Sequence, residues 1–255
     1  MLILAIGDVI GRPGRQTLNF FLPKIKQEYG VDLTIINAEN IAGGIGVTPE
    51  TAEELFTAGA DVLTSGNHIW AHKTIVPYLD TEMSLIRPLN YPPGVPGRGY
   101  TIKKGVLVVN LIGRTFMNNY DCPFRAMDIL LAQMGNKHKV IIIDFHAEAT
   151  SEKVALGRYL DGRVSAVLGT HTHIGTIDAQ LLPKGTAYVT DIGMTGPVDS
   201  IIGDETENVL QRFLTQLPYR MSAASGKSVL NAVLVRVDDM TGKAVDIERI
   251  QREID

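Results

Sequence analysis

The sequence predicts an α/β fold, in which parallel strands alternate with helices. Apolar, β-branched blocks recur along the chain, and most are nearly continuous rather than alternating, as in strands covered on both faces. Stretches with helix-type ends lie between these blocks. Short polar runs come directly after several blocks, where parallel strands would bring them to one shared edge. These three observations together favour an open sheet with helices on its faces.

Seven apolar blocks are the predicted strands. They cover residues 2–7, 32–37, 60–64, 106–112, 139–145, 164–168 and 186–190. The first block has neither basic residues before it nor a cleavage-like site after it, so we interpret it as a strand rather than as a secretory signal.

The predicted helices are recognised by their ends. For a helix over 48–58, Thr48 is a suitable cap, Pro49 suits the first helical position and Gly59 follows the last turn. A helix over about 14–29 ends near Gly30. Further helices are expected over 123–135, 151–160 and 205–216. Because strands and helices alternate, the class is α/β.

The C-terminal part differs from this alternation. Two strand-like runs, 228–237 and 244–250, flank a turn-forming stretch and predict an antiparallel hairpin at a sheet edge. An edge of this kind leaves association into a homo-oligomer open. The segment 88–99 holds four prolines and three glycines, so it is either a stiff loop at the rim or a simple connection.

Composition bounds the class of protein. The chain has 255 residues, 45% hydrophobic content and a formal charge of −4, which suit one domain over 1–255. Lys and Arg are scattered, so no footprint for duplex nucleic acid is predicted. The single Cys122 excludes an internal disulfide framework and a thiolate metal cluster. Such low cysteine content fits a cytoplasmic location. No apolar run reaches the roughly 20 residues that span a bilayer, so no membrane partner is predicted.

Five polar runs follow the apolar blocks, and they predict a site for two metal ions. Their candidate residues are Asp8, Glu39, Asn40, Asn67, His68, His146, His171 and His173. Carboxylate, carboxamide and imidazole groups are hard or borderline ligands that suit divalent cations. Each run alone has an ordinary explanation, such as a helix cap, a turn or a core histidine. Recurrence at strand ends is what favours a common site.

Two spacings bear on how these residues act. Alternation by two would place His171 and His173 on the same side of an extended segment, facing one centre. His68 follows Asn67 directly and points differently, which suits action on a substrate rather than on a metal. The glycines at 7, 11 and 14 do not match the G-x-G-x-x-G turn, so a nicotinamide cofactor is disfavoured.

The order of these motifs resembles the calcineurin-like metallophosphoesterases. The runs Gly-Asp, Asn-Ala-Glu-Asn, Gly-Asn-His, a lone His and His-x-His are most similar to the bacterial YmdB-like branch of 2′,3′-cyclic-nucleotide phosphodiesterases. This resemblance spans nearly the whole chain and implies a four-layer αββα sandwich. The chain departs from the broad superfamily in two places: Ile10 stands where its opening Asp-x-His has histidine, and Glu39 replaces its bridging aspartate.

The resemblance also implies a division of the site. Asp8, Glu39, Asn40 and His173 would bind one metal, and Glu39, Asn67, His146 and His171 the other, with Fe or Mn most suitable. A hydroxide bridging the metals would attack the phosphorus of a small phosphodiester, a cyclic nucleotide, while His68 protonates the departing alkoxide.

Other functions fit the same residues. A broad-specificity phosphatase or nuclease would use the same metals, and a regulatory protein would keep the metal site with weak catalysis. A metal-free α/β binding module would require eight polar residues at strand ends to be unrelated. Outer-loop residues are candidates for substrate contacts: Arg12, Arg98 and Arg114 for phosphate, and Tyr91, Tyr100 and Phe116 for base stacking.

Overall fold

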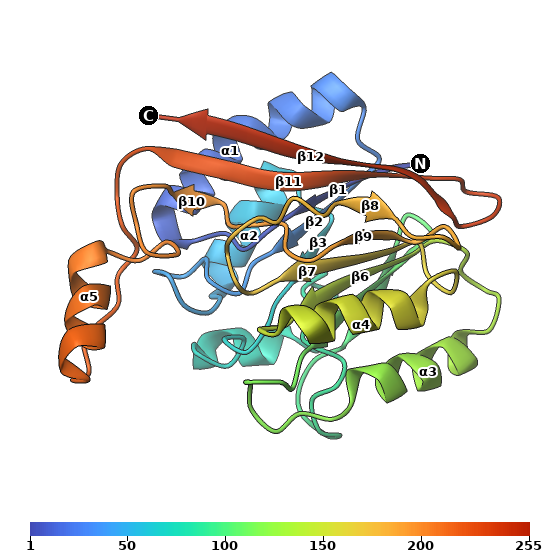
Figure 1. The fold of residues 1–255 in the computed structure, drawn as a ribbon, viewed down its shortest axis with the longest axis horizontal. Helices are drawn as coiled ribbons and strands as arrows, with labels where there is room; N and C mark the ends of the chain where they lie inside the picture. The colour runs from blue at the N-terminus through green and yellow to red at the C-terminus, as the bar shows by residue number, and fades with distance from the viewer.

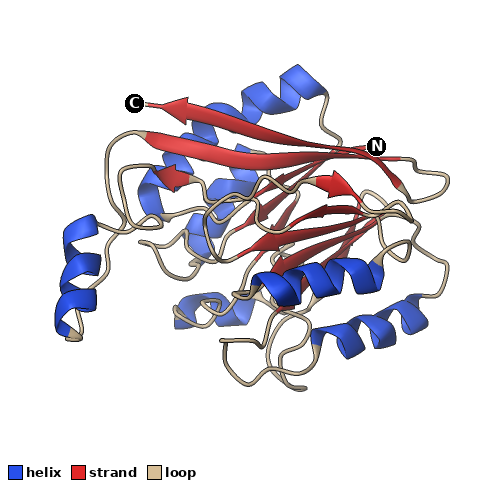
Figure 2. Ribbon diagram, viewed as in Figure 1, coloured by secondary structure: helices blue, strands red, loops and turns tan.

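The computed structural model describes residues 1–255 and contains two six-stranded sheets packed face to face between helices (Figures 1 and 2). The first sheet contains β1 (Leu2–Ile6), β2 (Leu33–Asn37), β3 (Val62–Thr64), β10 (Gly196–Pro197), β11 (Ser228–Val237) and β12 (Ala244–Ile254). The second contains β4 (Tyr100–Lys103), β5 (Val106–Ile112), β6 (Ile141–His146), β7 (Ala166–Thr170), β8 (Gln180–Leu181) and β9 (Ala187–Val189). The helices are α1 (Gly11–Tyr29), α2 (Pro49–Ala58), the 3-10 helix η1 (Lys73–Tyr78), α3 (Pro123–Met134), α4 (Thr150–Leu160) and α5 (Thr206–Thr215).

Three hydrophobic cores separate four layers. Alternate side chains of β1 belong to different cores: Leu4 packs with Leu55 of α2, whereas Ile3 packs with Val108 of the other sheet. The third core lies between the second sheet and its helices and includes Leu156 of α4. The order helix, sheet, sheet, helix is the predicted αββα sandwich, and it explains why the strands are apolar on both faces.

Parallel pairing brings the strand ends together. The first sheet has the order β10-β11-β1-β2-β3, with β12 on β11, and the second has the order β4-β5-β6-β7-β9-β8. Strands β1, β2 and β3 are parallel, as are β5, β6, β7 and β9. Consequently the carboxyl ends of β1 to β3 share one edge, and those of β5 to β7 share another.

All seven predicted strands and all five predicted helices are present. Helix α1 begins at Gly11, three residues earlier than expected, because Pro13 is accommodated in the first helical turn. The C-terminal hairpin is confirmed, with β12 at the edge and β11 paired to both β1 and β12. The sequence did not predict β4, β8, β10 or η1; β8 and β10 have two residues each, too few to show a periodicity. The segment 88–99 contains no helix or strand.

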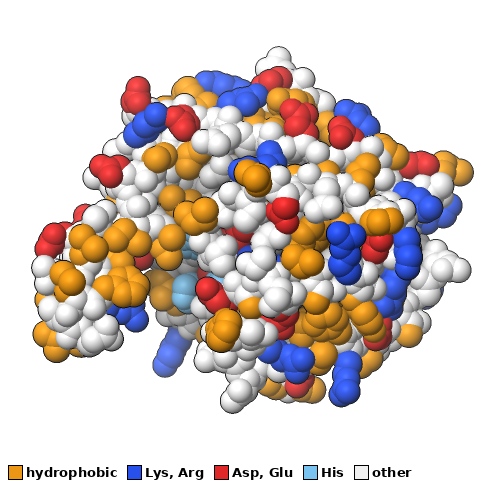
Figure 3. Space-filling model, in the orientation of Figure 1, with side chains coloured by type: hydrophobic (Ala, Val, Ile, Leu, Met, Phe, Trp, Pro, Cys, Tyr) orange, Lys and Arg blue, Asp and Glu red, His pale blue; other side chains and the backbone are white.

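Helix α5 stands out from the rest of the molecule (Figure 1). Only Val209 of this helix is buried, while Leu210, Phe213 and Leu214 are exposed. Figure 3 shows apolar side chains over this helix, with histidine side chains in a hollow beside it. None of the helices in the chain combines the length and the apolar character needed to cross a membrane.

Candidate functional site

The predicted site residues lie at the carboxyl ends of strands from both sheets. From the first sheet, Asp8 follows β1, Glu39 and Asn40 follow β2, and Asn67 and His68 follow β3. From the second sheet, His146 ends β6, and His171 and His173 follow β7. Contacts between their side chains join all eight into one cluster.

One group of potential ligands surrounds a single imidazole nitrogen. His146 Nε2 lies 2.9 Å from His171 Nδ1 and 3.1 Å from Glu39 Oε2. It also lies 3.2 Å from Asn67 Oδ1. A ring nitrogen carries at most one proton, and that proton cannot serve three acceptors at once. A metal cation, in contrast, could bind all four of these nitrogen and oxygen atoms at once.

A second group of potential ligands contains Asp8, Glu39 and His173. Ligand atoms of Asp8, Glu39 and His173 all lie within 4.8 Å of one another. Asp8 Oδ1 is 3.8 Å from His173 Nε2 and is buried without any hydrogen-bond partner. Burying an unpaired carboxylate oxygen is costly unless a cation balances it. Because Glu39 belongs to both groups, the residues present fit two neighbouring divalent ions, and these groups are candidate metal sites.

The pKa values of several cluster residues are shifted by burial and by the charges of their neighbours. Burial raises the pKa of Asp8. Burial would also raise the pKa of Glu39, but His146 and His68 beside it hold that pKa well below its usual range. For His146 burial is opposed by Glu39 and other carboxylates, which raise its pKa to about 9. Burial, together with the neighbouring His146, lowers the pKa of His171 to about 3. The carboxylates thus attract positive charge to the centre of the cluster.

Each imidazole is oriented through its second nitrogen. His146 Nδ1 lies 3.0 Å from Thr170 Oγ1, which donates to Asp144 Oδ1 at 2.7 Å. His171 Nε2 lies 3.1 Å from a carboxylate oxygen of Glu148. Partners of this kind hold a metal-binding imidazole in one tautomer and one orientation.

His173 is oriented by backbone rather than by a side chain, since its Nδ1 lies 2.6 Å from the carbonyl oxygen of Ile202. Neither this contact nor the other three partners, Asp144, Thr170 and Glu148, were predicted from the sequence. Asp144 could have been found, because a carboxylate inside an apolar strand is an unusual signal. A backbone carbonyl leaves no signal in the sequence.

The predicted geometry of the His-x-His run is wrong. β7 ends at Thr170, and His171 and His173 have φ angles of +95° and +66°, so the segment is not extended. Left-handed backbone is sterically disfavoured for residues other than glycine. The turn directs the two imidazoles into different groups, His171 toward Glu39 and His146, and His173 toward Asp8 and Glu39.

His68 lies at the edge of the cluster. Its Nδ1 is 2.8 Å from Asn40 Oδ1 and 3.2 Å from Glu39 Oε1, and its side chain is 34% exposed. The carboxamide nitrogen of Asn40 faces Glu39 Oε1 and His173 Nε2, at 3.2 and 3.3 Å. Nδ1 of His68 is therefore engaged by the cluster, whereas its Nε2 makes no such contact.

Two glycines allow the strand ends to approach one another. A Cβ on Gly66 would lie 2.3 Å from Glu39 Oε2 and from His146 Nε2. A Cβ on Gly7 would lie 1.7 Å from the carbonyl oxygen of Gly193. Glycine is therefore needed at Gly66 so that two candidate ligands can pack against the turn, and at Gly7 so that the backbone of Gly193 can approach.

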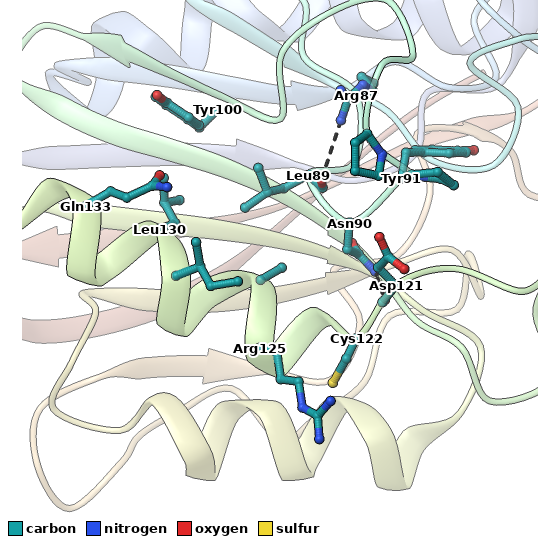
Figure 4. Close-up of a pocket in the computed structure, with 14 residues that line it drawn as sticks. Arg87, Leu89, Asn90, Tyr91, Tyr100, Asp121, Cys122, Arg125, Leu130 and Gln133 are labelled. Carbon is teal, nitrogen blue, oxygen red and sulfur yellow. Dashed lines mark hydrogen bonds between the residues drawn. The ribbon is translucent and has the colours of Figure 1, made fainter.

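A separate cavity lies against α3. It has a volume of about 510 Å³ and is lined by Tyr91 and Tyr100 among others, but by none of the eight predicted site residues (Figure 4). The Tyr91 hydroxyl lies 3.4 Å from the carbonyl oxygen of Gly66. Arg98 donates to the carbonyl of Thr81, and Phe116 is 88% exposed. The predicted substrate contacts of these side chains stay predictions.

Comparison with known proteins agrees with the fold and with the motifs. The family model described as YmdB-like protein matches residues 4–250. The chain is 51% identical over 254 residues to the 2′,3′-cyclic-nucleotide 2′-phosphodiesterase of Bacillus subtilis strain 168, covering 98% of this chain and 96% of that protein. It is 34% identical to a putative phosphatase/phosphodiesterase of Mycoplasma pneumoniae, covering 96% and 91% of the two chains.

Solved structures show the same architecture. A hypothetical protein from Thermus thermophilus superposes with a TM-score of 0.93 at 46% identity, covering 99% of both chains. A Mycoplasma pneumoniae structure described as a novel phosphatase gives a TM-score of 0.93 at 33% identity, covering 99% of this chain and 93% of its own. The chain therefore belongs to the YmdB-like protein family and has the four-layer α/β fold of the metallophosphoesterases.

Proposed function

We propose that this chain is a dinuclear-metal phosphodiesterase that hydrolyses cyclic nucleotides of the 2′,3′ type. The observation that carries the proposal is the pair of ligand groups that share Glu39. The name of the Bacillus subtilis relative, at 51% identity over nearly the whole chain, supports the choice of substrate. A cytoplasmic location belongs to the proposal, in keeping with the single cysteine.

The ligands are assigned from the two groups. Asp8, Glu39, Asn40 and His173 would hold one ion, and Glu39, Asn67, His146 and His171 the other, with Glu39 bridging. Coordination by Asn40 requires its carboxamide to turn over, since its oxygen faces His68. Nitrogen and oxygen ligands without a thiolate suit Fe or Mn.

The bound ions would lower the pKa of a shared water and clamp phosphate oxygens for in-line attack. Asp8 and Glu39 contribute only two negative charges. With two divalent ions and a hydroxide, the site would keep a net charge of about +1, which would attract an anionic phosphate.

His68 is assigned as the general acid. Its Nδ1 lies 3.2 Å from Glu39 Oε1 and beside the Asn40 carboxamide, whichever way that carboxamide is turned. Nε2 is therefore the nitrogen from which protonated His68 would donate to a substrate. A ribose alkoxide is a poor leaving group, and protonating it as the P–O bond breaks is the step that a cyclic diester needs most.

The direct test is hydrolysis of 2′,3′-cyclic AMP by the purified protein. We expect no turnover after chelation and restored turnover after Mn²⁺ or Fe²⁺ is added. A protein that binds two metal ions per chain but does not hydrolyse the diester would contradict the proposal.

A broad-specificity phosphatase is the second candidate, favoured by the name of the Mycoplasma pneumoniae relative. Rates on a phosphomonoester and on a cyclic diester, measured with the same metal-loaded protein, separate the two candidates. A regulatory protein that only binds nucleotide would not need His68 beside its ligands.

Loss of the Glu148 carboxylate should weaken the metal held by His171. We expect Glu148→Ala to lower Mn²⁺ affinity by roughly 10-fold, because His171 Nε2 loses its 3.1 Å partner. Glu148→Gln keeps an oxygen acceptor and should lose less. Glu53→Ala removes an exposed carboxylate from α2 and is the control. Equal Mn²⁺ affinities for Glu148→Ala and Glu53→Ala, measured by calorimetric titration, would argue against this role.

A further inference from the structure

A buried ion pair lies beneath the cluster and has no part in the proposed reaction. Lys153 Nζ of α4 lies 2.7 Å from Asp191 Oδ2, and the two side chains are 1% and 0% exposed. Burying two charges is costly, and such a pair is often no more stabilising than apolar side chains of the same size. Stability alone therefore does not explain why this ion pair is buried here.

Asp191 binds the residue between the two metal-site histidines of the second sheet. Its Oδ2 accepts from the hydroxyl of Thr172 at 2.7 Å and from the backbone N–H of Thr172 at 3.2 Å. His171 and His173, on either side of Thr172, both have left-handed φ angles. A backbone conformation of this kind persists only where surrounding contacts impose it. The two bonds from Thr172 to Asp191 are contacts that can do so.

The same carboxylate also reaches the segment that supports Asp8. Asp191 Oδ1 accepts from the backbone N–H of Gly193 at 2.8 Å. The carbonyl of Gly193 packs against Gly7, and the next residues bind the site directly: Met194 N–H donates to His173 O and Thr195 N–H donates to Asp8 O, at 2.9 and 2.8 Å. One buried side chain thus joins ligand-bearing segments of both sheets.

Lys153 balances the charge of this carboxylate. A buried carboxylate without a counter-charge is costly, because burial removes the water that would stabilise its charge. The ammonium of Lys153 supplies that counter-charge at 2.7 Å from Oδ2. Asp191 can therefore lie buried at the point where its two oxygens accept from Thr172 and Gly193.

We propose that Asp191, with Lys153 as its counter-ion, is a positioning residue that holds the turn at Thr172 and so sets His171 and His173 on their separate metal ions. The inference rests on the proposed ligand roles of these two histidines. It does not depend on which phosphate ester is the substrate.

The first test removes one hydroxyl. Thr172→Val is nearly isosteric and should fold, but it loses the 2.7 Å bond to Asp191. We expect Mn²⁺ affinity, measured by calorimetric titration, to fall about 10- to 100-fold, the range for partners behind metal ligands. Thr172→Ser keeps the hydroxyl and should restore the wild-type affinity. The control is Thr186→Val, which removes a buried hydroxyl that binds Val164 O and Gly162 N–H, outside the cluster.

The second test addresses the charge. Lys153→Met should weaken Mn²⁺ binding, because Asp191 loses its counter-charge. Asp191→Asn should weaken it too, because it leaves the ammonium of Lys153 buried without a carboxylate. The double variant Lys153→Met with Asp191→Asn removes both charges and keeps an amide oxygen as acceptor. Its Mn²⁺ affinity should exceed that of either single variant.

The outcomes are distinct. The inference is supported if Thr172→Val loses Mn²⁺ affinity while its metal-free melting temperature stays at the wild-type value, and if Thr172→Ser keeps the wild-type affinity. Wild-type affinity in both Thr172→Val and the double variant would overturn it, as would an equal loss in Thr186→Val. Because metal binding is the readout, a wild-type protein that binds two ions but hydrolyses no cyclic nucleotide would defeat the proposed function and leave this test intact.

Discussion

Replacing His68 with asparagine is expected to lower kcat for 2′,3′-cyclic AMP by roughly 10²- to 10⁴-fold, the usual contribution of a general acid. Metal content should stay at the wild-type level, because His68 is outside both ligand groups. Asparagine keeps a polar side chain near Asn40 but cannot protonate an alkoxide. Steady-state rates, with metal content measured on the same samples, check this result.

The leaving group supplies an internal control for His68. Bis(p-nitrophenyl) phosphate releases a stable phenolate that needs no protonation, so His68→Asn should lose much less activity on this diester than on the cyclic nucleotide. His138→Asn, in the connection between α3 and β6, is the matched control and should behave as wild type. Equal losses on both diesters would contradict the role of general acid.

Replacing Glu39 with glutamine is expected to abolish the ability of the site to hold two metal ions. Glu39 is the one residue common to both ligand groups, and its oxygens lie 3.1 Å from His146 Nε2 and 3.2 Å from His68 Nδ1. A carboxamide has a single oxygen ligand and no charge, so it cannot bridge two cations. Activity should fall by more than about 10²-fold, beyond the usual effect of residues that act behind the ligands.

Thermal unfolding gives a second measure of Glu39→Gln. Ions that bind only the folded protein raise its melting temperature. Mn²⁺ should therefore stabilise the wild type, and it should stabilise Glu39→Gln much less. Glu28→Gln removes a carboxylate that pairs with Arg252 at the surface, outside both ligand groups, and should keep the full response to Mn²⁺. A full response in Glu39→Gln would contradict the bridging role.

The positions of the site residues were predictable because strands carry clear signals. Nearly continuous apolar blocks located β1, β2, β3, β6 and β7, and parallel pairing brings their carboxyl ends to shared edges. The proximity of Asp8 to Glu39 follows from that topology, whereas His146 joins them only because the second sheet packs on the first. The four-layer arrangement came from the resemblance, since the sequence of one strand does not tell which of two sheets it joins.

Features that depend on backbone conformation or on distant packing were not predictable. Alternation suggested an extended His-x-His segment, but the φ angles of His171 and His173 are left-handed, which no local pattern indicates. The contact from His173 to the carbonyl of Ile202 depends on a segment 29 residues away. The pair Lys153 and Asp191 is likewise formed only when α4 packs on the second sheet.

The stoichiometry of Mn²⁺ bound to metal-free protein tests the central claim most directly. The shared carboxylate predicts two ions per chain for the wild type and for His68→Asn, and fewer than two for Glu39→Gln. One ion or none on the wild type, or two ions on Glu39→Gln, would contradict a dinuclear centre bridged by Glu39.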